Sequence, residues 1–126
     1  MRILLAEDDL ILADALCRAL VQSAYAVDIA DNGEQADRSL ALVIYDLAIL
    51  DIGLPGIDGY ETCRRIRARN LLLPVIAITG FGQESDVTRA KEAGFTEHIT
   101  KPVDLENLHR VLTSLRAPRA LPAPPQ

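Results

Sequence analysis

The sequence Ile3-Leu4-Leu5-Ala6-Glu7-Asp8-Asp9 places four apolar residues directly before three acidic ones. A short apolar run of this kind is typical of a strand that is covered on both faces, as in a parallel sheet. Asp9 is a suitable N-cap for a following helix, in which Leu12, Leu16 and Leu20 recur at four-residue spacing. The stretch therefore predicts a strand, an acidic loop and a helix.

The same alternation continues along the chain. Apolar runs predict further strands at 27–30, 47–50, 75–78 and 98–100, and helical patterns lie at Gly33–Leu42, Gly59–Ala68, Ser85–Ala93 and from Asp104 to about Leu115. Gly94 follows the fourth helical pattern, where a C-terminal glycine is expected. Five strand-helix units with right-handed crossovers predict an α/β fold, a three-layer doubly wound five-stranded parallel sheet.

Length and composition favour one domain with its own core. The chain has 126 residues, of which 49% are hydrophobic and 25% are charged, so it can bury a core without disulfides or a structural metal. Cys17 and Cys63 form neither a disulfide framework nor a zinc motif. Four of the seven prolines lie in residues 118–126. We therefore predict a domain at residues 1–116 and a Pro-rich tail, or the start of a linker, at 117–126.

The charge pattern argues against several classes of partner. The formal net charge is -5, and residues 1–63 hold twelve acids against three bases. An acidic domain is a poor partner for nucleic-acid phosphates. The arginines of the basic run at 64–69 spread over more than half of a helix circumference, which predicts a solvated face, and no aromatic residues are interleaved with them. We therefore expect no nucleic-acid binding by this domain alone. Residues 3–6 are too few for a signal peptide, and no apolar run approaches the ~18 residues of a membrane span. We expect a soluble, cytoplasmic protein.

Reactive side chains follow most of the predicted strands. The first strand ends before Glu7 and Asp8, the third before Asp51, the fourth before Thr79 and the fifth before Lys101. Because parallel strands share one carboxyl edge, these residues are predicted to form one pocket. Three carboxylates at close range need a cation, and an all-oxygen ligand set favours Mg²⁺ (or Mn²⁺). With a lysine and a threonine suited to phosphoryl oxygens, the pocket is equipped for phosphoryl transfer onto Asp51.

The residues resemble a known family, the receiver domain of two-component response regulators. Residues 3–9, 45–51, 54–59, 74–80 and 100–102 match it in order and spacing, and the likeness extends to about residue 115. The resemblance implies a flavodoxin-like (receiver) fold with strand order 2-1-3-4-5, an order for which a chemotaxis member of this family is a standard example.

The resemblance also implies site roles. Asp51 would accept a phosphoryl group from a phosphohistidine on a sensor histidine kinase or phosphotransfer protein. Asp8, Asp51 and the backbone carbonyl of Gly53 would ligate Mg²⁺, and Glu7 would act through a bound water. Lys101 would pair with the acyl phosphate. The protein would be a signalling switch rather than an enzyme, with self-phosphorylation and self-dephosphorylation as its only catalysis.

The resemblance places the switch residues at Thr79, which would move toward the phosphate, and at position 98, which would turn inward behind it. His98 stands where the family usually has an aromatic residue. Either the switch is pH-sensitive or weaker, or His98 merely lies at the exposed end of the fifth strand. Gly53 has no side chain to shield the phosphate from water, and Phe81 is expected to offset part of that exposure. Gly53 would shorten the lifetime of the phosphate and Phe81 would lengthen it, so the two residues have opposite expected effects.

Other functions stay open at this stage. An aspartate-nucleophile phosphatase would need a second Asp where this chain has Gly53, and a flavodoxin-like nucleotide binder would need hydrogen-bond donors where the acidic loop stands. An interaction module independent of phosphate would not need the complete set of site residues. If the chain is a receiver, it is either a single-domain receiver or a receiver fragment of a DNA-binding transcriptional response regulator. A homodimer through the fourth helix, fifth strand and fifth helix is possible.

Overall fold

The computed structural model describes residues 1–80 and 84–116. Its strands are β1 (Arg2–Ala6), β2 (Ala26–Ala30), β3 (Leu47–Asp51), β4 (Val75–Thr79) and β5 (Glu97–Thr100), and its helices are α1 (Leu10–Gln22), α2 (Gly33–Leu42), α3 (Gly59–Arg69), α4 (Glu84–Ala93) and α5 (Leu105–Arg116). The strands form one parallel sheet in the order β2-β1-β3-β4-β5. The α/β fold and the order 2-1-3-4-5 predicted above are confirmed.

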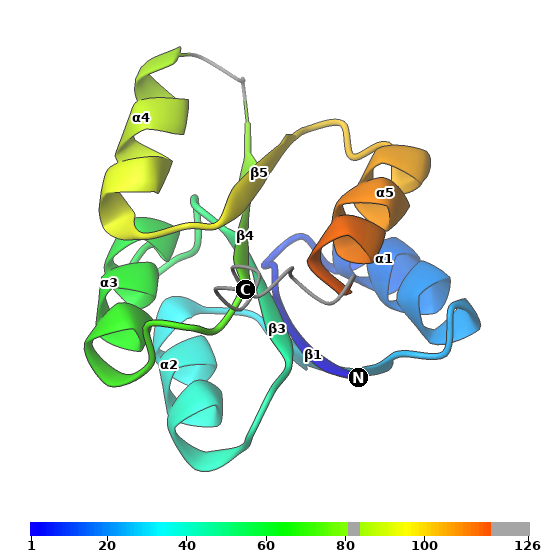
Figure 1. Ribbon diagram of the computed structural model, residues 1–126, viewed down its shortest axis with the longest axis horizontal. Helices are drawn as coiled ribbons and strands as arrows, with labels where there is room; N and C mark the ends of the chain where they lie inside the picture. Colours follow the sequence, from blue (N-terminus) through cyan, green and yellow to red (C-terminus); the bar gives the residue numbers. More distant parts are fainter. Residues whose placement is uncertain (81–83, 117–126) are drawn as a thin grey trace, which may run out of the picture.

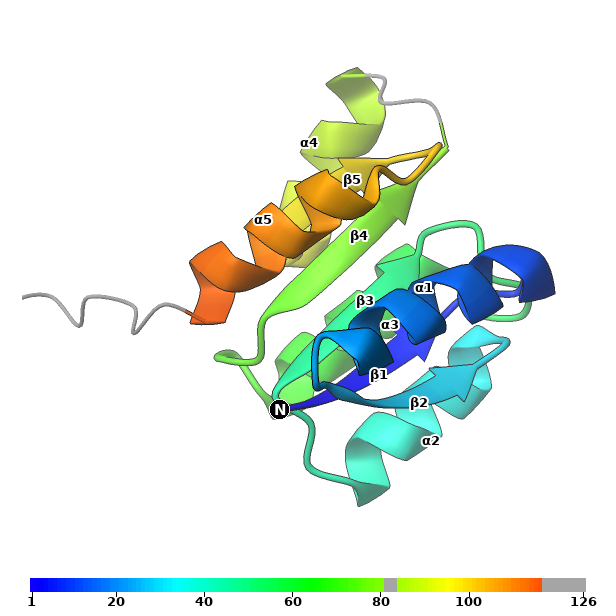
Figure 2. The ribbon, with the colours of Figure 1, turned by 90° about the vertical axis from the view of Figure 1, so that its right-hand side faces the viewer.

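Helices cover both faces of the sheet, which gives three layers. Figure 1 shows α2, α3 and α4 on one side and α1 and α5 on the other, and Figure 2 shows α1 and α5 in front of the strands. All five residues of β3 and all five of β4 are buried. This double burial explains why these strands are continuous apolar runs rather than alternating ones.

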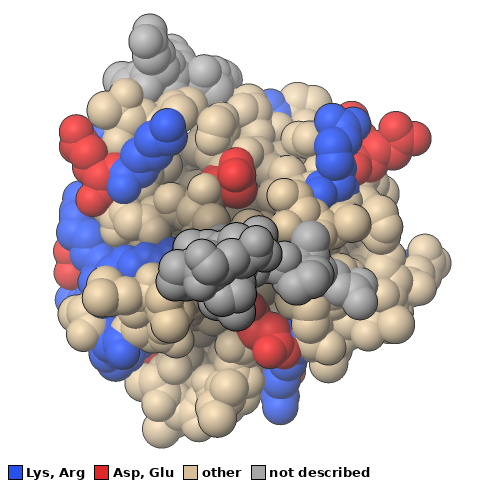
Figure 3. Space-filling view, in the orientation of Figure 1, with Lys and Arg blue, Asp and Glu red and all other residues tan. Residues whose placement is uncertain are grey.

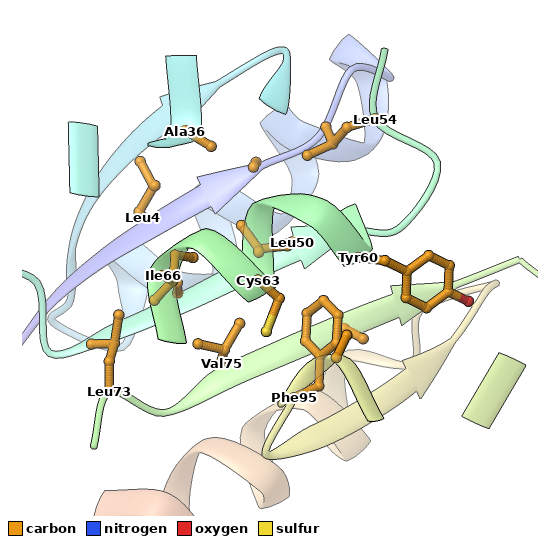
Figure 4. Close-up of a cluster of buried hydrophobic side chains, with 14 of the residues drawn as sticks. Leu4, Ala36, Leu50, Leu54, Tyr60, Cys63, Ile66, Leu73, Val75 and Phe95 are labelled. Carbon is orange, nitrogen blue, oxygen red and sulfur yellow. The ribbon is translucent and has the colours of Figure 1, made fainter. Parts of the chain in front are cut away.

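Successive side chains of each strand enter opposite halves of the core. Leu4 belongs to the cluster on the α2, α3 and α4 side, where it lies with Leu50, Ile66 and Val75 (Figure 4). Its neighbours in β1 point the other way, as the period of two in a strand requires. They join the second cluster, which includes Ile3, Leu5, Leu16, Leu20, Ile49, Ile76, Leu108 and Leu112.

Local signals in the sequence set the ends of the elements. Asp9 caps α1, because its carboxylate accepts the backbone N–H groups of Ile11 at 3.0 Å and Leu12 at 3.2 Å. Gly94 follows α4 with φ +105°, a left-handed conformation that favours glycine. Neighbouring strands end within one residue of each other, and Thr79 is paired with Thr100. The residues after each strand are therefore brought to one edge.

The arginines of α3 are engaged within the protein. Arg65 and Arg69 pair with Asp37 of α2 at 3.6 and 2.7 Å. Arg67 turns inward, contrary to the solvated face expected from the sequence, and donates to the carbonyl oxygens of Gly94 at 2.8 Å and Leu73. Figure 3 shows basic side chains gathered over α3. Because these arginines have acidic or backbone partners, the run is explained as structure rather than as a nucleic-acid surface.

The other sequence predictions concern the cysteines, membrane spans and the domain limits. Cys63 is buried, and burial raises the pKa of its thiol to about 11, which fits an inert core residue. Within residues 1–80 and 84–116, no helix combines the length and apolar character that a bilayer span requires. The predicted tail at 117–126 and Phe81 lie outside the described residues. The domain limits therefore stay a prediction.

Candidate functional site

Three acidic residues meet at the carboxyl edge of the sheet. Glu7 and Asp8 follow β1, and Asp51 is the last residue of β3, the strand beside it. One carboxylate oxygen of each lies within 4.8 Å of the others. Glu7 and Asp51 are 0% and 5% exposed, whereas Asp8 is exposed. The site therefore has two buried carboxylates and a third at its mouth.

Two donors hold the carboxylate of Asp51 in place. The backbone N–H of Gly53 donates to Oδ1 at 2.8 Å, and Lys101 Nζ donates to Oδ2 at 2.9 Å. Lys101 comes directly after β5, and its backbone N–H donates to the Thr79 carbonyl. The peptide bond between Lys101 and Pro102 is cis. Its Nζ also lies 3.2 Å from Glu7 Oε1. One lysine thus serves as counter-charge to both buried carboxylates.

The two buried carboxylates do not share their negative charge equally. Burial, together with the hydrogen bond to Asp51 and its charge, raises the pKa of Glu7 to about 7. Burial also opposes ionisation of Asp51, but hydrogen bonds with Glu7, Lys101 and the Gly53 N–H outweigh it and lower the pKa of Asp51. Without a cation, Asp51 is therefore the more readily ionised of the two carboxyls, and Glu7 titrates near neutral pH.

The buried polar atoms of the site fit a cation and a phosphoryl group. Glu7 Oε1 is buried and pairs with Lys101, and among the described residues the buried Thr79 Oγ1 makes no hydrogen bond. A buried hydroxyl without a partner is costly unless a further group binds there. The ligand atoms are all oxygens, with no His or Cys in the cluster. A hard cation that keeps some of its waters, such as Mg²⁺, fits this donor set.

Comparison with known proteins adds an independent finding. The model of the response regulator receiver domain family matches residues 3–113 of the chain. This chain belongs to that family. The resemblance inferred from the sequence is confirmed, and the chain is a receiver domain of two-component response regulators.

Curated relatives carry the receiver within a longer chain. The transcriptional regulatory protein TctD of Salmonella typhimurium is 42% identical over 115 residues, which cover 91% of this chain and 51% of TctD. The response regulator protein PmrA of Pseudomonas aeruginosa is 38% identical over 125 residues, which cover 97% of this chain and 57% of PmrA. This receiver thus spans about half the length of the curated relatives it matches.

Solved structures agree with the fold. A putative response regulator from Chloroflexus aurantiacus is 32% identical and superposes with a TM-score of 0.86 over 90% of this chain and 95% of its own. The receiver domain of sensor histidine kinase PA1611 from Pseudomonas aeruginosa, also 32% identical, has a TM-score of 0.85 over 90% and 95% of the two chains. That structure has a magnesium ion coordinated in its active site cleft.

The receiver brings together the side chains that its sequence singled out. Glu7, Asp8, Asp51 and Lys101 form one cluster, and Thr79 is buried at the end of the neighbouring strand β4. Gly53 lies beside them through its backbone.

His98 is set back from the other site residues. It is half-buried in β5, where it pairs with Ala77, two residues before Thr79. With residues of α4 it lines a groove of about 390 Å³. The structure places it on the same face of the sheet as Thr79.

Sequence reasoning missed one residue that contacts the loop between β3 and α3, the loop that follows Asp51. Glu34 of α2 accepts a hydrogen bond from the backbone of Ile57, which lies 23 residues away in the chain. An exposed glutamate in the first turn of a helix is so common that it carries no functional signal. Only the tertiary contact reveals it.

Proposed function

We propose that this receiver is a phosphoacceptor of a two-component phosphorelay and switches conformation when Asp51 is phosphorylated. The observation that carries the proposal is the environment of Asp51. A buried, ionised carboxylate is held between the Gly53 N–H and Lys101, and two further carboxylates lie within 4.8 Å. A carboxylate in this setting is a suitable nucleophile toward phosphorus.

The transfer needs only one bond to form and one to break. A carboxylate oxygen of Asp51 attacks the phosphorus of a phosphohistidine, and the P–N bond breaks as the imidazole leaves. Asp8, Asp51 and the Gly53 carbonyl would hold Mg²⁺, and Glu7 would act through a water. When bound, the cation offsets the charge of the transferring phosphoryl oxygens. Lys101, already next to Asp51, would then pair with the new acyl phosphate.

The proposed switch uses Thr79 and His98. The buried Thr79 hydroxyl lacks a partner within the described residues, so it would gain one by turning toward a phosphoryl oxygen. His98 would follow it inward along the same face of the sheet. This movement would alter the groove that His98 lines with Val87, Ala90, Phe95 and their neighbours, and so change the surface formed by α4 and β5.

The partners follow from the same chemistry. A sensor histidine kinase or a phosphotransfer protein would supply the phosphoryl group, and the receiver would then act in the cytoplasm. The relatives TctD and PmrA carry the names of regulators, and they favour an output domain that binds DNA in a longer protein. A single-domain receiver is the alternative. Sequencing the gene beyond codon 126 distinguishes them.

Intact-protein mass spectrometry tests the proposed function. Incubation with a small acyl-phosphate donor and Mg²⁺ should add one phosphoryl group, and removal of the metal with EDTA should prevent the gain. The same sample should show no sustained hydrolysis of a generic phosphate ester. Turnover of such an ester would instead favour the aspartate-nucleophile phosphatase.

We further propose that the phosphorylated receiver pairs through α4, β5 and α5. Arg89 is engaged with Tyr60, whose ring centroid lies 4.3 Å from the guanidinium. The proposal therefore rests on the other exposed charged residues of this face, which carry both signs and could pair across a two-fold axis: Lys91, Glu92, Glu97, Glu106 and Arg110.

Sedimentation at increasing concentration tests this dimer. With the phosphodonor, the receiver should dimerise at lower concentration than without it. Arg110→Glu should weaken the dimer at least fivefold, because it places like charges in the interface. An unchanged association constant for this variant would contradict the proposed interface.

A further inference from the structure

The loop between β3 and α3, residues 52–58, is attached to the site at its inner end. We call it the acceptor loop. The Gly53 N–H binds the Asp51 carboxylate at 2.8 Å, and the Gly59 N–H binds the Ile52 carbonyl at 3.1 Å. The Asp58 carboxylate accepts the Glu61 N–H at 2.9 Å and so caps α3. Both ends of the loop are therefore fixed by β3 and α3.

The middle of the acceptor loop lies against the first turn of α2. The Gly33 N–H donates to the Pro55 carbonyl at 3.3 Å, and the Ile57 N–H donates to Glu34 Oε1 at 3.1 Å. A Cβ atom on Gly33 would collide with the Ile57 carbonyl, and one on Gly56 would collide with the Glu34 carboxylate. The helix and the loop are thus in close contact, and the Glu34 carboxylate sits on the loop backbone.

Gly56 gives the loop the shape that this contact needs. Its φ of +79° is in the left-handed region, which residues with a Cβ rarely adopt. The turn directs the next amide, that of Ile57, toward α2. The side-chain oxygen at this position accepts that N–H group, and an amide oxygen of the same reach could do so as well. Glu34 therefore binds the acceptor loop directly after the turn at Gly56.

We propose that Glu34 is a positioning residue of the phosphoacceptor site, acting through the acceptor loop. The inference rests on the proposed function, because it concerns the same Mg²⁺ and phosphoryl site. In that site the Gly53 N–H binds the Asp51 carboxylate, and the Gly53 carbonyl would bind the cation. Both groups are correctly positioned only when the acceptor loop keeps its conformation. Loss of the Glu34 contact lowers the fraction of molecules in the competent loop conformation, and the affinity for Mg²⁺ falls by that fraction.

Four variants separate positioning from simple charge. Glu34→Ala removes the acceptor of the Ile57 N–H. Glu34→Asp keeps the charge, but its side chain is one methylene shorter and does not reach that N–H. Glu34→Gln keeps an oxygen at the same reach. The matched control is Asp14→Ala, which deletes the same charge from an exposed residue that pairs with Arg18 within its own helix. The changes at Glu34 and Asp14 affect exposed side chains, so we expect all four proteins to fold.

Two measurements report on the proposal, and one needs no metal. Calorimetric titration with Mg²⁺ should show about fivefold weaker binding for Glu34→Ala and Glu34→Asp, the loss expected for one exposed hydrogen bond. Glu34→Gln and Asp14→Ala should stay within twofold of the wild type. In metal-free protein, the Ile57 amide should exchange its hydrogen at least fivefold faster in Glu34→Ala and Glu34→Asp than in the other proteins.

The outcomes distinguish this inference from the proposed function. Equal Mg²⁺ affinity in Glu34→Ala, Glu34→Asp and the wild type would overturn it, although phosphorylation of Asp51 would be untouched. Equal weakening in Glu34→Gln and Asp14→Ala would also overturn it, because charge alone would then explain the effect. A wild type that neither binds Mg²⁺ nor gains a phosphoryl group would instead refute the proposed function itself.

Discussion

Replacing Asp51 by Asn should abolish the gain of a phosphoryl group from a small acyl-phosphate donor. The amide is a poor nucleophile toward phosphorus, yet it is close in size to the carboxylate and retains an oxygen that can accept the Gly53 N–H. The fold should therefore survive while incorporation falls below detection, a loss of at least ~100-fold. Intact-protein mass spectrometry with Mg²⁺ measures it.

A nearby aspartate provides the matched control. Asp46 lies before β3 and accepts the Arg2 backbone N–H through its carboxylate at 2.7 Å. Asp46→Asn should keep that bond and take up the phosphoryl group at the wild-type rate. Incorporation that persists in Asp51→Asn would mean that another residue is the acceptor, and the assignment of Asp51 would then be wrong.

Replacing Glu7 by Gln should stabilise the metal-free protein at pH 8 and weaken its response to Mg²⁺. Glu7 is fully buried beside Asp51, and one lysine serves both carboxylates. Removing the second buried charge should raise the free energy of unfolding by about 1–2 kcal/mol in EDTA. The stabilisation by Mg²⁺ should shrink, because its ligand set is incomplete. Urea unfolding with and without Mg²⁺ measures both effects.

The pH dependence of this effect has a definite sign. The pKa of Glu7 is raised from 4.5 to about 7 in the folded protein. A raised pKa contributes stability that is fully present below pH 4.5 and is lost as the pH rises through about 7. Metal-free wild type should therefore be less stable at pH 8 than at pH 5, whereas Glu7→Gln should lack this contribution. A wild type whose stability matches that of Glu7→Gln at both pH values would contradict the proposed charge conflict.

Much of the site could be predicted because it lies at strand ends. Once β1, β3, β4 and β5 are recognised as parallel strands, the residues that follow them must share one edge, and so Glu7, Asp51 and Lys101 could be brought together without coordinates. The strand limits were also close, since each observed strand extends the predicted one by a single residue. Short buried strands have clear apolar patterns, which explains this agreement.

Contacts between distant segments could not be predicted in the same way. Arg67 reads as one of several solvated arginines, yet it binds the carbonyl oxygen of Gly94, which lies 27 residues away. Glu34 reads as an ordinary residue in the first turn of a helix, yet it holds the acceptor loop. The choice of partner in each case depends on how helices and loops pack, and neither residue type nor spacing encodes that packing.

By itself, the sequence determined the class of fold, the edge at which chemistry is possible and the residue types gathered there, because apolar periodicity and strand direction are local properties. The three carboxylates predicted to share that edge, Glu7, Asp8 and Asp51, already implied a cation. Only the tertiary structure decided how the charges are divided, with Asp51 ionised between two donors and a proton favoured on Glu7. Burial and distances of a few ångströms govern such a division, and these exist only once the chain has folded.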